Sequence, residues 1–258
     1  MTVTERRPHV LGDLGIVIRE DGDVLRSAVD VVTHMAIPGT RSVRLSVLAT
    51  WADALLGLVA IRHIAPGLTV TLELEVDLFA DVRSSGTLEA TGYIVKAGRA
   101  VIVTSMDISD EEGRPVAFSR ATFMASPDPQ LTMPKGSWAL DRFSSRRGVL
   151  TEPFAVAAGC RRLEPGVASL ACAPHVLNSG KTLNGGFLAL AVEEAVLSAS
   201  ASANPVSMSL HYLRPVRQGP AIARAEVHGG TGVVELRDAE TDALAVTATT
   251  RSLRPRRQ

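Results

Sequence analysis

The sequence is poor in cysteine, in aromatic residues and in net charge. It has two cysteines, Cys160 and Cys172, and aromatic residues make up 4% of the chain. Lys plus Arg and Asp plus Glu both number 27, so the formal net charge is zero. Two cysteines make no disulfide framework, and neither has the spacing of a metal-ligand motif. The balanced charge argues against a general nucleic-acid-binding protein, which should have a basic excess.

Long apolar runs without charge are also missing. No stretch approaches 18 such residues, so we expect no membrane span. The first eight residues include a basic pair with no apolar run behind it, which predicts no signal peptide. A chain of 258 residues with 46% hydrophobic content can nevertheless build one large core or two ordinary ones. We therefore expect a cytoplasmic globular protein.

The most informative stretch is a polar loop over residues 178–184 that runs into an Ala- and Leu-rich segment. Gly185 and Gly186 allow the backbone to turn tightly and to lie close to another element. Residues 187–202 contain no Gly or Pro, which predicts a helix. The first amides of that helix would be free to bind a developing negative charge. Taken alone, however, an Asn-Gly-Gly sequence is more often an ordinary cap, and Glu193-Glu194 more often a solvated helix face.

An internal duplication strengthens the functional interpretation of this stretch. In each half the pattern predicts a strand, a turn, a strand, a loop, a helix and then alternating strands. The predicted ranges are 16–18, 24–32, helix 45–64, 68–76, 87–96, 100–108 and 115–124 in the first half, and 152–160, 167–173, helix 187–202, 206–212, 221–227, 232–236 and 244–252 in the second. Asp53 and Glu193 hold equivalent places in the two helices, about 140 residues apart.

Between the repeats lies a segment rich in Pro and basic residues, which reads as a linker. We therefore divide the chain into a first domain at 1–126, a linker at 127–147 and a second domain at 148–258. One long helix cannot bury itself, so each should lie across the apolar face of its sheet. The two halves should pair about a pseudo-two-fold axis, as a homodimer would.

Both halves resemble the hotdog fold. The whole chain is similar to the fused double-hotdog acyl-CoA thioesterases of the phenylacetate-pathway and hydroxybenzoyl-CoA type. The motif of that family is Asn or Gln, then His-Gly-Gly six residues on, then an acidic residue seven after the second Gly. Asn178, Asn184-Gly185-Gly186 and Glu193 match it, with Asn184 replacing His. The segment 51–57 resembles the acidic helix segment, while Pro38 and Arg44-Leu45-Ser46 depart from the loop pattern.

The resemblance implies an α+β tandem hotdog with catalytic groups drawn from both halves. Asp53 would act as nucleophile or general base, Asn178 would polarise the thioester carbonyl, and the Gly185 amide, next to Gly186, would stabilise the oxyanion. Asn184, in place of the usual His, would contact the substrate. The other composite site would join Glu193 with Pro38 and Leu45, and it is degenerate because Pro38 has neither a side-chain amide nor an N–H.

The remaining candidates are weaker. Arg214 and Arg217 lie in a segment that resembles the family's strand end, and guanidinium groups suit the phosphates of coenzyme A. The same pair is equally well explained as solvated residues at a strand end. Glu194 is expected at the surface or at an interface. No His, Cys and Asp cluster has metal spacing, so we predict a metal-independent enzyme without a cofactor.

The leading hypothesis is therefore a hydrolase of acyl-CoA or acyl-carrier-protein thioesters, which assembles into homo-oligomers of the double-hotdog chain. Two other functions remain open. A non-catalytic acyl-CoA-binding protein is favoured by the missing His and the altered first loop. A hotdog dehydratase or hydratase would need a catalytic His where Asn184 stands.

Overall fold

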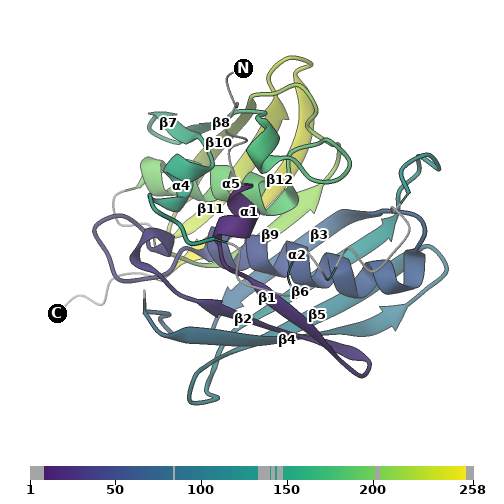
Figure 1. Ribbon diagram of the computed structural model, residues 1–258. Coiled ribbons are helices and arrows are strands. Elements are labelled where there is room, and N and C mark those ends of the chain that lie inside the picture. Colours follow the sequence, from purple (N-terminus) through teal and green to yellow (C-terminus); the bar gives the residue numbers. More distant parts are fainter. Residues whose placement is uncertain are drawn as a thin grey trace, which may run out of the picture.

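The computed structural model describes residues 9–83, 85–132, 140, 143, 148–200 and 204–253. Most of the predicted linker, including 133–139 and 144–147, therefore lies outside the described residues. The two halves in Figure 1 are each a long helix on an antiparallel sheet, the tandem hotdog arrangement.

The first half contains two helices, a 3-10 turn and six strands. They are α1 (Val10–Asp13), β1 (Val17–Asp21), β2 (Val24–Asp30), η1 (Thr33–Met35), α2 (Leu45–Ile64), β3 (Thr69–Leu78), β4 (Thr87–Ala97), β5 (Val101–Asp110) and β6 (Pro115–Ala125). The second half repeats this order with α4 (Phe154–Ala157), β7 (Cys160–Glu164), β8 (Val167–Leu170), η2 (Pro174–Val176), α5 (Gly185–Ala199), β9 (Pro205–Tyr212), β10 (Ala221–His228), β11 (Thr231–Asp238) and β12 (Ala243–Ser252).

The described strands form one 12-stranded sheet in the order β1-β2-β4-β5-β6-β3-β9-β12-β11-β10-β8-β7. Read inward from either edge, each strand meets its repeat equivalent, so the sheet has the pseudo-two-fold symmetry that the duplication predicts. The halves join where β3 pairs with β9, with Leu74 opposite Leu210 and Val76 opposite Met208. Helix α2 packs on β3 to β6 and helix α5 on β7, β8, β10 and β11, and the two helices also contact each other.

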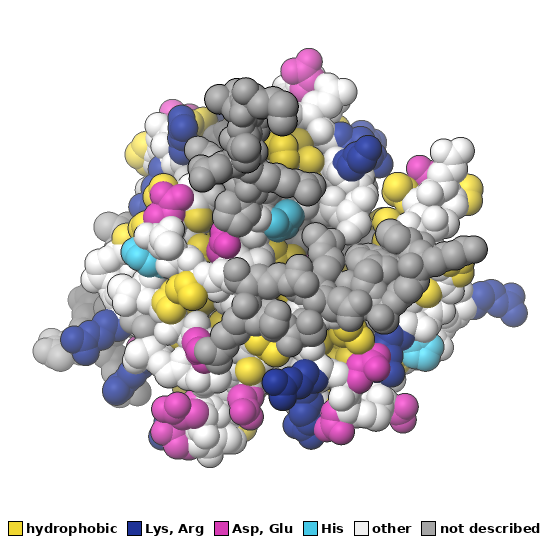
Figure 2. All heavy atoms as spheres, in the orientation of Figure 1, with side chains coloured by type: hydrophobic (Ala, Val, Ile, Leu, Met, Phe, Trp, Pro, Cys, Tyr) yellow, Lys and Arg dark blue, Asp and Glu magenta, His cyan; other side chains and the backbone are white. Residues whose placement is uncertain are grey.

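Helix α2 begins and ends at the predicted residues, and most of its side chains are buried. Among the described residues it is the one helix long and apolar enough to cross a membrane, but 72% of that window is buried inside the protein, as in a core helix. Charged side chains of both signs are interspersed on the face in Figure 2, as the zero net charge would suggest.

The strand predicted at residues 152–160 is wrong. Phe154–Ala157 forms the short helix α4, and the strand β7 begins only at Cys160. Phe154 is fully buried and its ring packs against that of Phe187, with centroids 5.8 Å apart. A helical turn places this ring against α5, a tertiary contact that local alternation does not encode.

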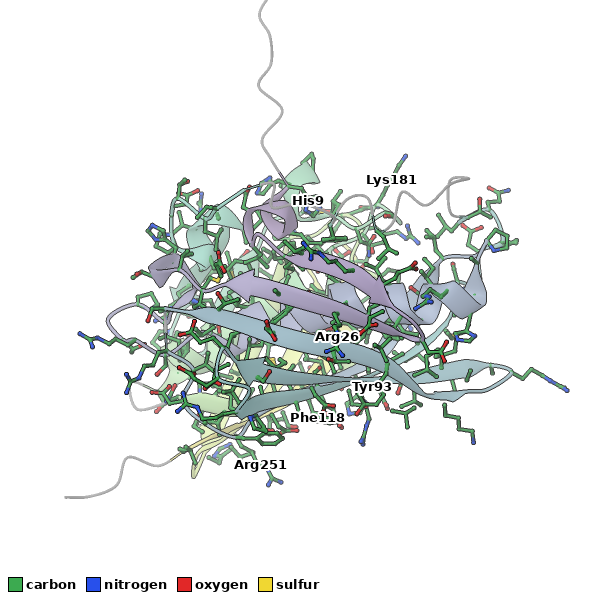
Figure 3. The ribbon with its side chains drawn as sticks, turned by 60° about the horizontal axis from the view of Figure 1, so that its bottom comes forward. His9, Arg26, Tyr93, Phe118, Lys181 and Arg251 are labelled. Carbon is green, nitrogen blue, oxygen red and sulfur yellow. The ribbon has the colours of Figure 1, made fainter. Side chains whose placement is uncertain are left out.

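Helix α1 belongs to the first half by sequence but packs on the second. Nε2 of the His9 ring lies 2.6 Å from the backbone oxygen of Leu177. Leu177 comes just before the loop that leads into α5. Val10 and Leu14 are buried in the common core. The N-terminal part of the described chain therefore ties the two halves together near that loop; Figure 3 labels His9 on α1 and Lys181 on the loop.

Candidate active site

Asp53 lies in the middle of α2 and faces the start of α5. The Thr71 hydroxyl on β3 donates a hydrogen bond of 2.9 Å to Asp53 Oδ1. Alternation along the predicted strand 68–76 puts Thr71 on the face opposite to Leu74 and Val76, and this expectation is wrong. The β3–β6 register shifts between Thr71 and Glu73, so Leu72 is an extra residue that turns Thr71 towards the helix.

The start of α5 comes close to α2 because two residues there have no side chain. A Cβ on Gly186 would lie 2.3 Å from the Thr50 Cα, and a Cβ on Gly185 would lie 3.1 Å from both Asp53 carboxylate oxygens. The sequence-based expectation that these glycines allow a close approach is confirmed, and the element approached is α2. The backbone of α5 thus lies directly against the Asp53 carboxylate.

Asn184 caps the same helix. Its side-chain oxygen accepts a hydrogen bond of 2.9 Å from the Gly186 amide, as an N-cap residue does. The Tyr212 hydroxyl, from β9, donates a 2.9 Å hydrogen bond to the Gly185 carbonyl. The peptide unit between Gly185 and Gly186 is therefore held at both its oxygen and its nitrogen.

The environment of Asp53 shifts its acidity. Burial raises the pKa of Asp53, and hydrogen bonds from Thr71, the Gly186 amide, the Asn184 side chain and the Gly185 amide act in the opposite direction. Burial, together with the negative charge of Asp53, holds the pKa of Tyr212 well above its usual value. Tyr212 therefore remains a proton donor beside the carboxylate. A buried carboxylate with a raised pKa beside the backbone amides of a helix start has the features of a catalytic base or nucleophile.

Asn178 serves the loop itself. Its side-chain oxygen accepts from the amides of Gly180 (2.9 Å) and Thr182 (3.2 Å), and its nitrogen donates to the Thr182 hydroxyl at 2.8 Å. These bonds shape the turn that leads into α5. The hydrogen bonds of Asn178 thus run within its own loop rather than to Asp53, so a role in polarising a substrate remains a prediction.

Glu193 occupies the equivalent position at the other end of the helix pair. Its carboxylate accepts hydrogen bonds from Arg44 Nη1 at 2.9 Å, the Ser46 amide at 3.2 Å and the Ser46 hydroxyl at 2.7 Å. Arg44 also forms an ion pair with Glu194 at 2.6 Å, and Arg162 does so at 2.6 Å from the other side. Arg44 and Glu193 are 1% and 0% exposed, so the arginine fills this site. Of the two places expected for Glu194, the interface is the one observed.

Arg214 and Arg217 are both exposed in the loop after β9. The Val216 carbonyl in that loop accepts a 3.0 Å hydrogen bond from the Leu183 amide, so the loop packs beside the one before α5. The buried Asp238 carboxylate holds it by accepting from the amides of Arg217 and Gly219 at 3.2 and 3.1 Å. The even choice between phosphate binding and simple solvation stays open for the two arginines.

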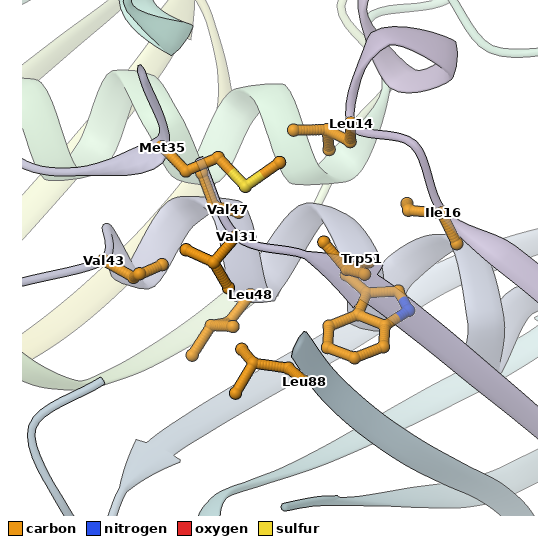
Figure 4. Close-up of a pocket in the computed structure, with 10 residues that line it drawn as sticks. Leu14, Ile16, Val31, Met35, Val43, Val47, Leu48, Trp51 and Leu88 are labelled. Carbon is orange, nitrogen blue, oxygen red and sulfur yellow. The ribbon is translucent and has the colours of Figure 1, made fainter. Parts of the chain in front are cut away.

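A small apolar pocket lies on the side of α2 away from Asp53 (Figure 4). Leu48 and Trp51 of α2 line it together with Met35 and Val43, which flank the first-half loop. Helical periodicity puts both α2 residues more than a quarter turn from Asp53. This pocket is therefore not part of the Asp53 site.

Sequence reasoning missed three residues here: Thr71, Tyr212 and Arg44. Nothing in the local pattern reveals Thr71, because a bulge decides its direction. Tyr212 ends the predicted strand 206–212, and its hydrogen-bond partner is a backbone carbonyl of another element, which the strand pattern does not reveal. Arg44 had a usable signal, since the duplication aligns it with Asn184.

Comparison with known proteins agrees with this fold. The family described as "Thioesterase superfamily" matches residues 46–117, and that described as "Acyl-CoA thioesterase N-terminal domain" matches 173–252, together more than half of the chain. The chain belongs to the thioesterase superfamily of hotdog proteins. None of the curated proteins matches the sequence.

Solved structures with a similar fold include two acyl-carrier-protein thioesterases. The 12:0-ACP thioesterase from Umbellularia californica aligns with a TM-score of 0.65 and 13% identity, over 92% of this chain and 100% of that one. An acyl-ACP thioesterase from Bacteroides thetaiotaomicron aligns with a TM-score of 0.61 and 11% identity, over 89% and 97%. At these identities the likeness shows the double-hotdog fold.

Proposed function

We propose that this protein hydrolyses acyl thioesters of coenzyme A or acyl carrier protein at one composite site between its halves. The observation that carries the proposal is the contact of the Asp53 carboxylate with the glycine backbone at the start of α5. The carboxylate comes from one half and the amides come from the other. Membership of the thioesterase superfamily supplies the reaction class.

Two routes fit these groups. As a general base, Asp53 takes a proton from water while the oxygen of that water bonds to the thioester carbonyl carbon. The C–S bond then breaks, and the leaving thiolate takes the proton from Asp53. As a nucleophile, Asp53 forms an anhydride with the acyl group, the thiolate leaves, and water cleaves the anhydride. Neither route requires a metal ion.

In both routes negative charge develops on the carbonyl oxygen. The Gly185 amide at the start of α5 stabilises this charge, and a single donor of this kind contributes about 3–4 kcal/mol. The Thr71 hydroxyl holds Oδ1 of the carboxylate and so orients Asp53 towards the start of α5. Arg214 and Arg217 contact the phosphates of the thiol carrier.

The second composite site does not turn over substrate in this proposal. Arg44 stands where the other site has Asn184, and its guanidinium forms ion pairs with Glu193 at 2.9 Å and with Glu194 at 2.6 Å. A substrate carbonyl would have to displace a buried arginine from two carboxylates. One working site per chain follows.

The test is thiol release from short, long and aryl acyl-CoA and acyl-ACP substrates by wild type and Asp53→Asn. Release that disappears in Asp53→Asn is the expected result. Binding without release in the wild type would instead indicate a non-catalytic acyl-thioester-binding protein. A single turnover in water labelled with oxygen-18 separates the routes, because only the nucleophilic route places the label in Asp53.

Hydration of an enoyl-CoA is the readout for the dehydratase alternative. Asn184 has no group that can exchange a proton, so we expect no such activity. The cytoplasmic location and the homo-oligomeric state expected from the sequence remain predictions.

A further inference from the structure

Four charged side chains meet where the start of α2 crosses the middle of α5, and we call them the Arg44 ion cluster: Arg44, Arg162, Glu193 and Glu194. Arg44 bridges the two carboxylates, with 2.9 Å to Glu193 and 2.6 Å to Glu194. Arg162, 2.6 Å from Glu194, balances the charge at two positive and two negative groups. Apart from Arg162, its members are at most 5% exposed.

The cluster and the proposed active site are connected by the same two helices. Arg44 is the N-cap of α2, which includes Asp53, and Glu193 lies on α5, which begins at Gly185. About 12 Å of helix separates Gly185 from Glu193. Because a helix is stiff over two turns, a shift at one crossing point changes the spacing at the other.

At the active-site end the two helices are held by backbone contact and by hydrogen bonds to one carboxylate. Gly185 and Gly186 have no side chains, and their backbone rests against Thr50 and Asp53. The Asn184 side chain and the two glycine amides all hydrogen-bond the single carboxylate of Asp53, which has no ion-pair partner among the described residues. The cluster end, by contrast, is fixed by directional bonds from Arg44 and Ser46 to Glu193.

We propose that the Arg44 ion cluster positions the Gly185–Gly186 backbone against Asp53, so that the inactive second site sets the geometry of the first. Arg44 and Glu193 are then positioning residues that act through the two helices. This inference rests on the proposed function, because it concerns the site at Asp53.

Stability alone is a different explanation, and it can be separated. A buried ion pair can often be replaced by apolar residues of similar volume without loss of stability. The double variant Arg44→Met with Glu193→Leu removes the pair and leaves Glu194 with Arg162. Arg44→Lys keeps the charge but loses the planar fork that reaches both carboxylates.

The experiment compares these variants with wild type, Asp53→Asn and a control, Arg114→Met, which removes an exposed ion pair with Asp110. Stability is measured by urea unfolding, and kcat, KM and the pH profile of kcat/KM are measured with the best thioester substrate.

Asp53 is faced by the Thr71 hydroxyl, the Tyr212 phenol, Asn184 and the two glycine amides. A shift of α5 that breaks the hydrogen bonds of its amides while Asp53 stays buried removes an effect that lowers the pKa of Asp53, so the acid limb of the profile moves to higher pH.

The double variant should fold, with kcat lower by about ten- to a hundred-fold, little change in KM, and the acid limb at higher pH. Arg44→Lys should fall between it and wild type, and Arg114→Met should match wild type. A folded double variant with wild-type kcat, or with lower kcat and an unmoved acid limb, overturns the inference. If the double variant does not fold, wild-type kinetics in Arg44→Lys overturn it. Turnover that survives in Asp53→Asn overturns the proposed function as well, which separates the two failures.

Discussion

The two crossing points of α2 and α5 share a backbone arrangement and differ in their side chains. At one, Asp53 faces Asn184-Gly185-Gly186; at the other, Glu193 faces Arg44-Leu45-Ser46. At the first point the backbone amides of two glycines face the Asp53 carboxylate, whereas at the second the Arg44 guanidinium and Ser46 bind the Glu193 carboxylate. The comparison teaches that a duplicated fold can supply the same geometry twice while its side chains allow chemistry once.

The largest expected effect is the loss of turnover in Asp53→Asn. Removal of a general base or nucleophile should lower kcat by about 10³-fold or more, measured as thiol release.

The raised pKa of Asp53 leads to a second prediction for the same variant, which concerns its stability. A group with a raised folded-state pKa stabilises the fold fully below its unfolded pKa and loses that effect as pH rises through the folded pKa. Asp53→Asn should therefore be at least as stable as wild type at neutral pH.

The matching change at the other crossing point should act on stability more than on chemistry. Glu193→Ala removes one of the two carboxylates that the buried Arg44 bridges and leaves two arginines for the single Glu194, and breaking a buried pair typically costs about 3–5 kcal/mol. Urea unfolding measures this loss. Turnover at low temperature should fall far less than in Asp53→Asn, and equal losses of turnover from Asp53→Ala and Glu193→Ala would contradict a single working site.

Closing the gap between the helices tests the glycine side of the comparison. A Cβ at residue 186 would fall 2.3 Å from the Thr50 Cα, which is backbone and cannot move aside. Gly186→Ala should therefore destabilise the protein by about 3 kcal/mol, the upper end for overpacking. Gly57→Ala is the control, because a Cβ there meets only the Phe123 ring at 3.8 Å. Equal unfolding midpoints for the two variants would contradict the close contact.

The smallest effect concerns Thr71, which holds the Asp53 carboxylate. Thr71→Val removes a hydrogen bond that lowers the pKa of Asp53. The acid limb of kcat/KM should then move to higher pH, with a fall in kcat of about ten-fold. Thr71→Ser keeps the hydroxyl and should restore both values. An unchanged limb in Thr71→Val would show that the hydroxyl does not act on Asp53.

Much of the fold could be predicted because it depends on local patterns. The boundaries of α2 follow from a run without Pro bounded by turn residues, and the strands follow from period-two alternation. The prediction of a strand at 152–160 failed because the burial of Phe154 depends on its contact with Phe187, which belongs to a distant helix. The interpretation of Glu193-Glu194 as a solvated helix face is wrong for the same reason. The two carboxylates are buried against Arg44 and Arg162, which lie far away in the sequence.

The sequence by itself determined the duplication, the class of most elements, and the two glycines, because repeated patterns and backbone preferences are local properties. It also singled out Asp53 and Glu193 as equivalent acids. Only the tertiary structure decided that Thr71 turns inward at a bulge, that Tyr212 reaches the Gly185 carbonyl, and that Arg44 occupies the second site. These outcomes depend on which atoms the packing of two helices and one continuous sheet brings within hydrogen-bond distance, and linear spacing does not specify that.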